Sequence, residues 1–445
     1  MAESSAGPGC DGRRSGPTTA AQEQLWKAAR QHEGSAFGNR PVGLWLHGPI
    51  DVAALRRCLR RLVARQPGLR TRYPVHGDGR VQEVLPEAEL DLQVLDLTGV
   101  TEPREYLWRW LAEGALQPFD LAREPPLAAH LAILSGAEAL LHLRCHHITF
   151  DAWSESVLVE QLSEALGDEA TGVPPTMTPL ASPIDLAIVQ RRRFGSAAGV
   201  ADRRAWAVEL AGLAEVPELF PAAPDVDPTE PLATVERVLS PDVVGDLNRV
   251  ARAQGSTLFV LLLAAFVATV YGRTRATDVV VGVPVATRTQ VRALPVITHL
   301  VNEVPVRVDA SGDPTAAELL DRVRRRFASV FARMETPFIS VFEELREDGT
   351  IRADTPFSLY FQLRNVPTAR HDPRSPLAIH PVHVPSGPGF LHLRIEADPG
   401  PPFVLRAHHR PSVCSSGDAD AVLERLIAAT RWLSTPMSRL SSLAK

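Results

Sequence analysis

The chain has 445 residues, 45% of them hydrophobic and 22% charged, which is the composition of a folded globular protein rather than of a disordered or fibrous chain. Its length suits two lobes of about 200 residues each. The formal net charge of -5 provides no overall positive field, so we expect no nucleic-acid partner.

The cysteines show neither the CxxC spacing of a zinc site nor the density of a disulfide scaffold, so we expect reduced thiols and a cytoplasmic protein. They stand at Cys10, Cys58, Cys145 and Cys414. The longest apolar run, residues 257–271, is shorter than the roughly 20 residues that a membrane-spanning helix needs. We expect it to form a buried helix, and we expect no membrane contact.

Residues 1–17 lack the continuous apolar stretch of a secretory signal and are expected to form a disordered tail. An N-terminal lobe is expected over residues 18–182. Three elements open this lobe, in the order strand, helix, strand: residues 41–47, 51–66 and 69–73. Asp51 stands at the N-cap position of the helix.

A second strand-to-helix unit follows in the same lobe. Residues 137–147 alternate as a strand does, and residues 152–166 repeat apolar side chains at helical spacing. The two faces of the strand are expected to carry Leu141, Leu143 and Cys145 on one side and His142, Arg144 and His146 on the other. Asp151 therefore lies at a turn, and such turns commonly carry function.

The second half of the chain begins after a Pro-rich stretch, residues 172–183, and we expect a C-terminal lobe over residues 183–445. A second Pro-rich stretch, residues 216–231, is expected to be a linker or surface crossover. Helices are predicted at 241–254, 257–271, 315–334 and 418–433, and strands at 278–284, 357–363, 380–384 and 391–396. Mixed elements in both halves predict two α/β sandwiches.

A histidine pair, His146 and His147, precedes Asp151 by four residues. Two histidines and one carboxylate could form the facial triad of a non-haem iron site. However, adjacent residues of an extended segment point to opposite faces, so the pair is poorly placed to grip one ion. We therefore expect no metal.

The three residues are expected to have different roles. His147 faces a cleft as a neutral imidazole that takes a proton from an attacking amine or hydroxyl group. For His146 we expect a structural, hydrogen-bonded role. Asp151 is expected to cap the following helix and to pair with an arginine, for which we choose Arg70; removing it would leave a buried charge unpaired.

Residues 146–154, HHITFDAWS, resemble the HHxxxDGWS signature of the condensation domains of nonribosomal peptide synthetases. Six further stretches resemble motifs of this family in the same order. They are QEQLW at 22–26, GLRTRY at 68–73, PFDLAREPPLAAHL at 118–131, DVVVGVPVATR at 278–288, VNEVPVR at 301–307 and FSLYFQLRN at 357–365.

This resemblance implies two chloramphenicol acetyltransferase-like lobes in a V, with a tunnel between them. It implies that the histidine matching His147 assists attack by the acceptor, and that the arginine matching Arg70 pairs with the active-site aspartate. Residues expected near the tunnel or as oxyanion donors are Ala152, Trp153 and Ser154, which follow Asp151, with His299 and Asn302 in the C-terminal lobe.

The resemblance also implies the substrates. An acyl group is expected to arrive as a thioester on the phosphopantetheine arm of a separate acyl or peptidyl carrier protein, and the acceptor to be a free or carrier-bound amine or alcohol. No bound cofactor is expected. Since the chain shows no adenylation domain and no LGGxS-like serine, we expect it to act in trans, as a monomer. Arg191 to Arg193 could meet an acidic carrier, although such a run is usually a solvated helix face.

Three positions depart from the family pattern. Ala152 replaces the motif glycine, where a methyl group would narrow the passage beside His147 or require a negative φ. Thr298-His299 replaces the usual Gly-Phe, and Pro67-Gly68 replaces the usual His-Glu. These departures leave the acceptor and the product bond open.

Two alternative functions remain at this point. One is an acyl-CoA-dependent O- or N-acyltransferase of the wider HHxxxD superfamily, although the C-terminal DFGWG motif of its plant-type branch is not present in the sequence. The other is a non-catalytic module that keeps the fold and recruits partner enzymes. The intact His147 and Asp151 argue against this module, while Ala152 keeps it open.

Overall fold

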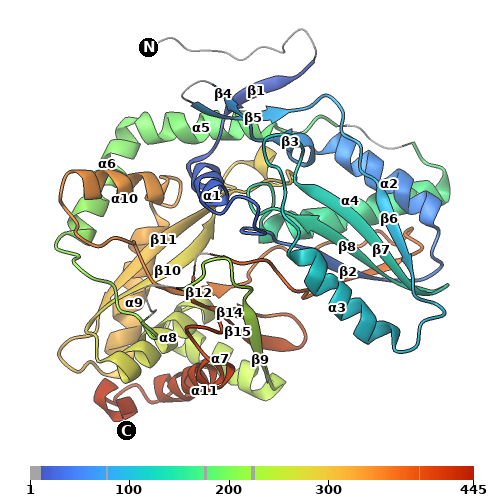
Figure 1. Cartoon of the computed structure of the whole chain (residues 1–445). Coiled ribbons are helices and arrows are strands. Elements are labelled where there is room, and N and C mark those ends of the chain that lie inside the picture. The colour runs from blue at the N-terminus through green and yellow to red at the C-terminus, as the bar shows by residue number, and fades with distance from the viewer. Residues whose placement is uncertain (1–11, 77–78, 175–177, 222–225, 390, 445) are drawn as a thin grey trace. The chain divides into compact units, whose positions relative to one another are not determined.

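The computed structural model describes residues 12–76, 79–174, 178–221, 226–389 and 391–444 (Figure 1). Contacts divide the chain into two compact units. The first unit comprises residues 1–192, 288–300 and 366–389, and the second comprises residues 193–287, 301–365 and 390–445.

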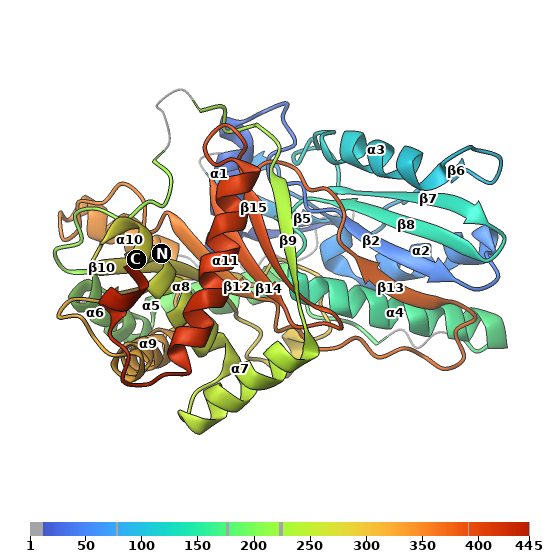
Figure 2. The same cartoon turned by 90° about the horizontal axis from the view of Figure 1, so that it is seen from below.

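The first unit is built on a five-stranded sheet. Its strand order is β13 (Ala378–Val382), β2 (Val42–His47), β8 (Glu138–Cys145), β7 (Leu127–Ser135) and β6 (Leu92–Asp96). Helices α2 (Val52–Arg65) and α4 (Ala152–Thr171) cover one face, and α3 (Pro103–Ala115) covers the other, as Figure 2 shows. Because side chains alternate along β8, Leu141 and Leu143 pack with α2 and α4, whereas Leu140 packs with α3.

A second, small sheet in this unit contains β1 (Arg14–Pro17), β5 (Gly79–Val84), β3 (Thr71–Arg72) and β4 (Val75–His76). The expected disordered tail over residues 1–17 is therefore wrong for β1, because this strand pairs with β5 and the Arg14 guanidinium lies 2.9 Å from Asp185. Residues 1–11 lie outside the described residues. Helix α1 (Ala20–Gln31) follows. Of the strand expected over residues 69–73, residues 71–72 form β3, whereas residues 69–70 belong to the 3-10 turn η1 (Pro67–Arg70).

The second unit is built on a six-stranded sheet. Its order is β11 (Val301–Asp309), β10 (Asp278–Ala286), β12 (Leu359–Leu363), β14 (Leu393–Asp398), β15 (Phe403–His409) and β9 (Ala233–Leu239). Its helices are α6 (Ala197–Leu210), α7 (Pro241–Ala253), α8 (Leu258–Thr274), α9 (Ala316–Phe331), α10 (Phe338–Glu347) and α11 (Ser416–Leu433). Helix α5 (Pro183–Gly195) leads from the first unit into the second. The 3-10 turn η3 (Leu440–Ala444) lies in the second unit, whereas the 3-10 turn η2 (Val291–Ala293) belongs to the first.

Helix α8 forms the centre of the second core. It is apolar on all sides, and all residues from Val260 to Val270 are buried, as the sequence predicted for this run. Within the described residues, no single helix has the length and apolar composition to cross a membrane; α7 and α8 meet that test only as a pair, and they are bent by 98°.

The two units differ from the predicted division at residues 182 and 183. Two segments of the second half contribute to the first unit because they bond to it directly. Strand β13 pairs with β2 at the edge of the first sheet, for example Ile379 with Leu46. Residues 288–300 bond to Ser154 of α4 and to Asp151, which precedes the helix. Because the chain returns to the first unit twice, a single boundary in the sequence cannot separate the two units.

Candidate active site

The histidine pair lies in the turn between β8 and α4. The backbone of residues 38–40 lies alongside it, since the His147 amide donates to the Gly38 carbonyl over 2.8 Å and the Arg40 amide donates to the Cys145 carbonyl over 2.7 Å. Gly38 has a φ of +81°, and a Cβ atom there would lie 2.7 Å from His146 Nε2. A glycine is therefore needed for this close approach.

His146 is buried, and both of its ring nitrogens are engaged. Nδ1 accepts a hydrogen bond from the Ile148 amide over 3.1 Å, so Nε2 carries the proton that is donated to the Phe37 carbonyl over 3.0 Å. Burial lowers the pKa of His146 to about 4. This ring is a neutral, fully bonded support of the turn.

His147 points elsewhere and is only partly buried. Its Nδ1 lies 2.6 Å from the Phe150 carbonyl oxygen, which can only accept, so Nδ1 carries the proton of the neutral ring. Nε2 is then left with its lone pair. Desolvation, with His299 and the Arg40 guanidinium nearby, holds the pKa of His147 well below its usual value.

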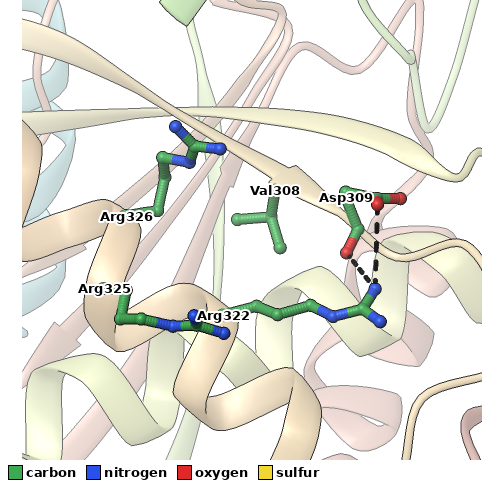
Figure 3. Close-up of a pocket in the computed structure, with 5 residues that line it drawn as sticks. All are labelled: Val308, Asp309, Arg322, Arg325 and Arg326. Carbon is green, nitrogen blue, oxygen red and sulfur yellow. Dashed lines mark hydrogen bonds and ion pairs between the residues drawn. The ribbon is translucent and has the colours of Figure 1, made fainter.

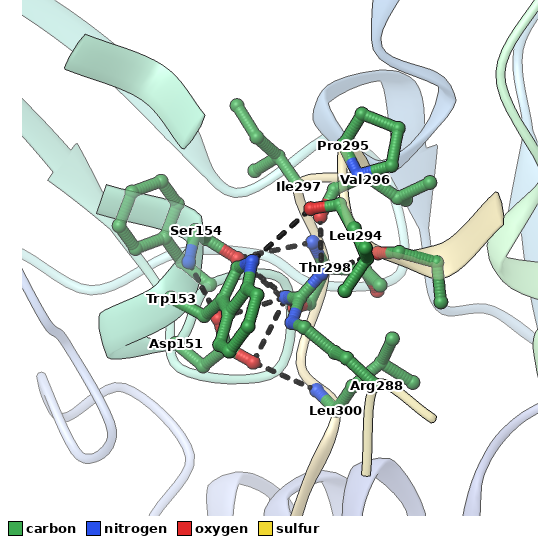
Figure 4. A network of polar contacts seen from close by, with 12 residues as sticks. Asp151, Trp153, Ser154, Arg288, Leu294, Pro295, Val296, Ile297, Thr298 and Leu300 are labelled. Carbon is green, nitrogen blue, oxygen red and sulfur yellow. Dashed lines mark hydrogen bonds and ion pairs between the residues drawn. The ribbon is translucent and has the colours of Figure 1, made fainter. Parts of the chain in front are cut away.

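Asp151 ends the turn and caps α4, accepting from the Ser154 amide over 2.7 Å. Its two oxygens lie 2.9 and 3.0 Å from Arg288 Nη2, and Oδ2 also accepts from the Leu300 amide over 3.0 Å (Figure 4). Burial by itself would raise the pKa of Asp151, but the Arg288 charge and these hydrogen bonds lower it overall. The carboxylate is therefore ionised and fully bonded.

The prediction that Arg70 pairs with Asp151 is wrong. The Arg70 guanidinium instead donates to backbone carbonyls of Val63, Ala64, Leu85 and Pro86, which joins the end of α2 to the segment after β5. Arg288 was missed as the partner, although it ends the DVVVGVPVATR stretch. Because residues 137 positions apart form the pair, only the tertiary structure brings them together.

Residues 288–300 are attached to the first unit at further points. The Gln66 side chain donates from Nε2 to the Pro295 carbonyl over 2.7 Å, and its Oε1 accepts from the Ile297 backbone amide over 2.9 Å. A Cβ atom on Gly68 would lie only 1.9 Å from the Ile297 carbonyl oxygen. The departure from the family pattern at Gly68 is thus explained by the close approach of this segment.

The residues that follow Asp151 support the same segment. Trp153 Nε1 donates to the Leu294 carbonyl over 3.1 Å, and Ser154 Oγ lies 2.6 Å from Asp151 Oδ1 and 3.0 Å from the Thr298 carbonyl. Ala152 is the first residue of α4, where helical backbone has a negative φ, so its methyl group is accommodated without strain.

The other two expected tunnel residues lie in different surroundings. His299 is buried, and its ring centroid lies 4.6 Å from that of His147, with the ring planes at 82°. Asn302 belongs to the second unit, where its side chain donates to the Met334 and Thr336 carbonyls and accepts from the Phe338 amide. Asn302 therefore holds the chain entering α10.

Another polar site lies away from the histidine pair. In the second unit a pocket of about 390 Å³ is lined by Val308 and by charged side chains of β11 and α9 (Figure 3). They are Asp309, Arg322, Arg325 and Arg326, and each arginine has a carboxylate partner within 4.0 Å. Among the described residues, no group of three His, Cys, Asp or Glu side chains is arranged to hold a metal ion.

Comparison with known proteins identifies the family and the fold. The family model for the condensation domain matches residues 13–377. This chain belongs to the condensation-domain family. The resemblance seen in the sequence and the expected mixed α/β, chloramphenicol acetyltransferase-like fold are both confirmed.

The condensation domain has relatives among peptide synthetases. It is 34% identical over 383 residues to a linear gramicidin synthase protein of Brevibacillus parabrevis, covering 83% of this chain and 7% of the relative. It is 34% identical over 349 residues to phosphinothricin tripeptide synthetase PhsB of Streptomyces viridochromogenes, covering 75% of this chain and 28% of the relative. The chain thus spans only a small part of the length of these relatives.

Solved structures agree in fold. The first condensation domain of the calcium-dependent antibiotic synthetase superposes with a TM-score of 0.81 at 22% identity, covering 96% of this chain and 98% of the other. The X-domain from teicoplanin biosynthesis superposes with a TM-score of 0.83 at 25% identity, covering 96% of each chain. That X-domain has also been solved in a complex with OxyB.

Proposed function

We propose that this condensation domain joins an acyl group, delivered as a thioester, to an amine or alcohol acceptor, with His147 assisting the attack. The observation that carries the proposal is the 2.6 Å contact between His147 Nδ1 and the Phe150 carbonyl. Since this contact commits the ring proton to Nδ1, the Nε2 lone pair is available to an acceptor N–H or O–H group.

The proton balance of the step follows from this arrangement. As the acceptor nitrogen or oxygen bonds to the acyl carbon, its proton passes to His147 Nε2. When the tetrahedral intermediate collapses, the C–S bond breaks and the thiolate takes that proton back, so the enzyme is regenerated. The low pKa of His147 keeps the ring neutral but makes it a weak base, so orientation of the acceptor contributes alongside a general-base effect of about 10²- to 10⁴-fold.

Charge on the acyl oxygen would be stabilised at the start of α4. The Ser154 amide is already bonded to Asp151, which leaves the amides of Ala152 and Trp153 as the candidate oxyanion donors. Both lie in the first turn of a 20-residue helix, where backbone N–H groups and the helix dipole favour negative charge. This narrows the donor set expected from the sequence, which included Ser154.

The acyl donor is proposed to arrive on the phosphopantetheine arm of a carrier domain that lies outside these 445 residues. Support comes from membership of the condensation-domain family and from the peptide synthetases among the relatives. The arm is a substrate carrier rather than a resident cofactor. The acceptor can be free or carrier-bound, and the product an amide or an ester.

A second function, the recruitment of a partner enzyme, is favoured by one observation. The X-domain, which has been solved in a complex with OxyB, shares 25% identity with this chain, against 22% for the calcium-dependent antibiotic domain. Catalysis is favoured instead by the hydrogen bond of His147 to the Phe150 carbonyl and by the ion pair of Asp151 with Arg288. The two functions differ in whether substitution of His147 has any effect on product formation.

The proposed test measures product formation by mass spectrometry. A carrier protein loaded with a series of acyl-phosphopantetheine thioesters is mixed with the full chain and a panel of free amines and alcohols; acyl-CoA donors are tested in parallel. We expect an amide or ester product that requires the carrier-bound donor and falls by about 10²-fold or more in His147→Ala.

The matched control is His371→Ala, which removes an exposed histidine. This variant should retain wild-type activity. Equal rates in wild type and His147→Ala would refute the catalytic role of His147. Absence of product with every donor, together with binding of a partner enzyme, would favour recruitment.

A further inference from the structure

The two imidazole rings at this site, those of His147 and His299, form a close pair. Their centroids lie 4.6 Å apart with the planes at 82°, so one ring presents its edge to the face of the other. Such edge-to-face contacts are favourable between aromatic rings. His299 is 6% exposed, and its Nδ1 has no hydrogen-bond partner in the described part of the chain.

The backbone on both sides of His299 is held in place. The Thr298 amide donates to Ser154 Oγ over 3.2 Å, and the Leu300 amide donates to Asp151 Oδ2 over 3.0 Å. Arg288 Nη2 also donates to the Thr298 carbonyl over 2.9 Å. The network that caps α4 therefore also fixes the position of the second ring against His147.

The charges around the pair are unequal. His147 is surrounded by Arg40, His146 and His299, each of which opposes a positive charge on it. Burial and the Arg288 charge also oppose a positive charge on His299, but the Asp151 carboxylate favours a proton on it. Two positive rings at 4.6 Å would repel strongly, so the pair accepts a single proton more readily than two.

We propose that His299 is a positioning residue for His147: its ring holds the His147 imidazole edge to face, and any proton taken up by the pair in the resting enzyme resides on His299, beside Asp151. His147 Nε2 is then free for the acceptor. This inference rests on the function proposed above for its catalytic meaning, but the pairing itself is a property of the folded chain.

Loss of the His299 imidazole should change the pKa of His147 in one direction only. Burial lowers the pKa of His299 to about 4, while Asp151 acts in the opposite direction. In wild type the first proton to enter the pair as the pH falls goes to His299, which opposes protonation of His147. Without a titratable side chain at position 299, the pKa of His147 rises.

The test is a histidine NMR titration of the full chain labelled in its imidazole rings. The variant His299→Phe keeps an aromatic ring against His147 but cannot take a proton. We expect the titration midpoint of His147 to rise by about one pH unit, a tenfold gain in proton affinity. The control His371→Phe, at an exposed position, leaves the His147 titration unchanged.

A second measurement uses wild type only, so it does not depend on the folding of a variant. The His147 resonance should show a small inflection at the pH where His299 titrates, because the two sites are coupled. An unshifted His147 midpoint in folded His299→Phe, or no inflection in wild type, would overturn the proposal.

The activity assay separates this inference from the proposed function. If product forms, the acidic limb of the rate profile of His299→Phe should move to higher pH by the same amount as the NMR midpoint. A shifted midpoint without product formation in wild type would retain the pairing and reject the catalytic function. Product formation in wild type with an unshifted His147 midpoint in His299→Phe would retain the catalytic function and reject the pairing.

Discussion

Arg288 Nη2 lies 2.9 Å from Asp151 Oδ1, and both side chains are 1% exposed. Removing one member of a buried pair leaves the other charge without compensation, which costs about 3–5 kcal/mol. Arg288→Ala should therefore lower the free energy of unfolding by about that amount, measured by urea denaturation. It should also loosen residues 288–300, because the same guanidinium donates to the Ala293, Val296 and Thr298 carbonyls.

The control for this change is Arg346→Ala. Its ion pair with Asp354 spans 3.4 Å, with the side chains 48% and 96% exposed. Exposed pairs contribute about 0–1 kcal/mol, so this variant should unfold close to wild type. Similar losses in both variants would contradict a structural role for the buried pair.

Gly68 provides a steric prediction. An alanine Cβ there would lie 1.9 Å from the Ile297 carbonyl oxygen, a backbone atom that cannot rotate away. Gly68→Ala should destabilise the protein by about 1–3 kcal/mol and displace the segment that carries His299. Gly99→Ala is the matched control, because nothing lies within 4 Å of its added Cβ. Thermal unfolding of both variants measures the difference, and equal melting temperatures would count against the close approach.

We expect the stability of the protein to fall at acid pH because of His142. The ring is 1% exposed, neither nitrogen has a partner among the residues that the structure describes, and burial lowers its pKa to about 3. The unfolded chain binds this proton near pH 6.5, so stability present above that pH is lost as the pH falls toward the folded pKa. His142→Phe removes this loss.

The measurement compares urea midpoints at pH 7 and pH 4.5. Wild type should lose about 2 kcal/mol more between the two values than His142→Phe does. The exposed control His371→Phe should follow wild type. An equal loss in His142→Phe and wild type would show that the His142 ring does not resist protonation in the folded state.

Ala152 gives a prediction about the departure from the family signature. Since this residue begins α4 with helical backbone, restoring glycine removes only a methyl group and adds freedom to the unfolded chain. Ala152→Gly should lower the free energy of unfolding by at most about 1 kcal/mol. A larger loss in chemical denaturation would mean that the methyl group makes packing contacts of its own.

Much of the local structure was predictable because it depends on neighbouring residues. The alternation of faces along β8, the capping by Asp51 and Asp151, and the apolar run of α8 each lie within one element, and the structure shows each of them. The orientations of His146 and His147 were not predictable in this way, because the strand ends at Cys145 and the pair lies at the turn that follows.

The sequence by itself therefore determined the mixed α/β class, the family and the strand-to-helix turn that carries His147. Only the tertiary structure decided that Arg288 rather than Arg70 neutralises Asp151, and that His299 lies beside His147. The physical reason is that burying the charge of Asp151 requires partners from wherever the chain returns. Residues 288–300 return there because Gly68 and Gln66 allow and hold the approach, and no periodicity or spacing records such a contact.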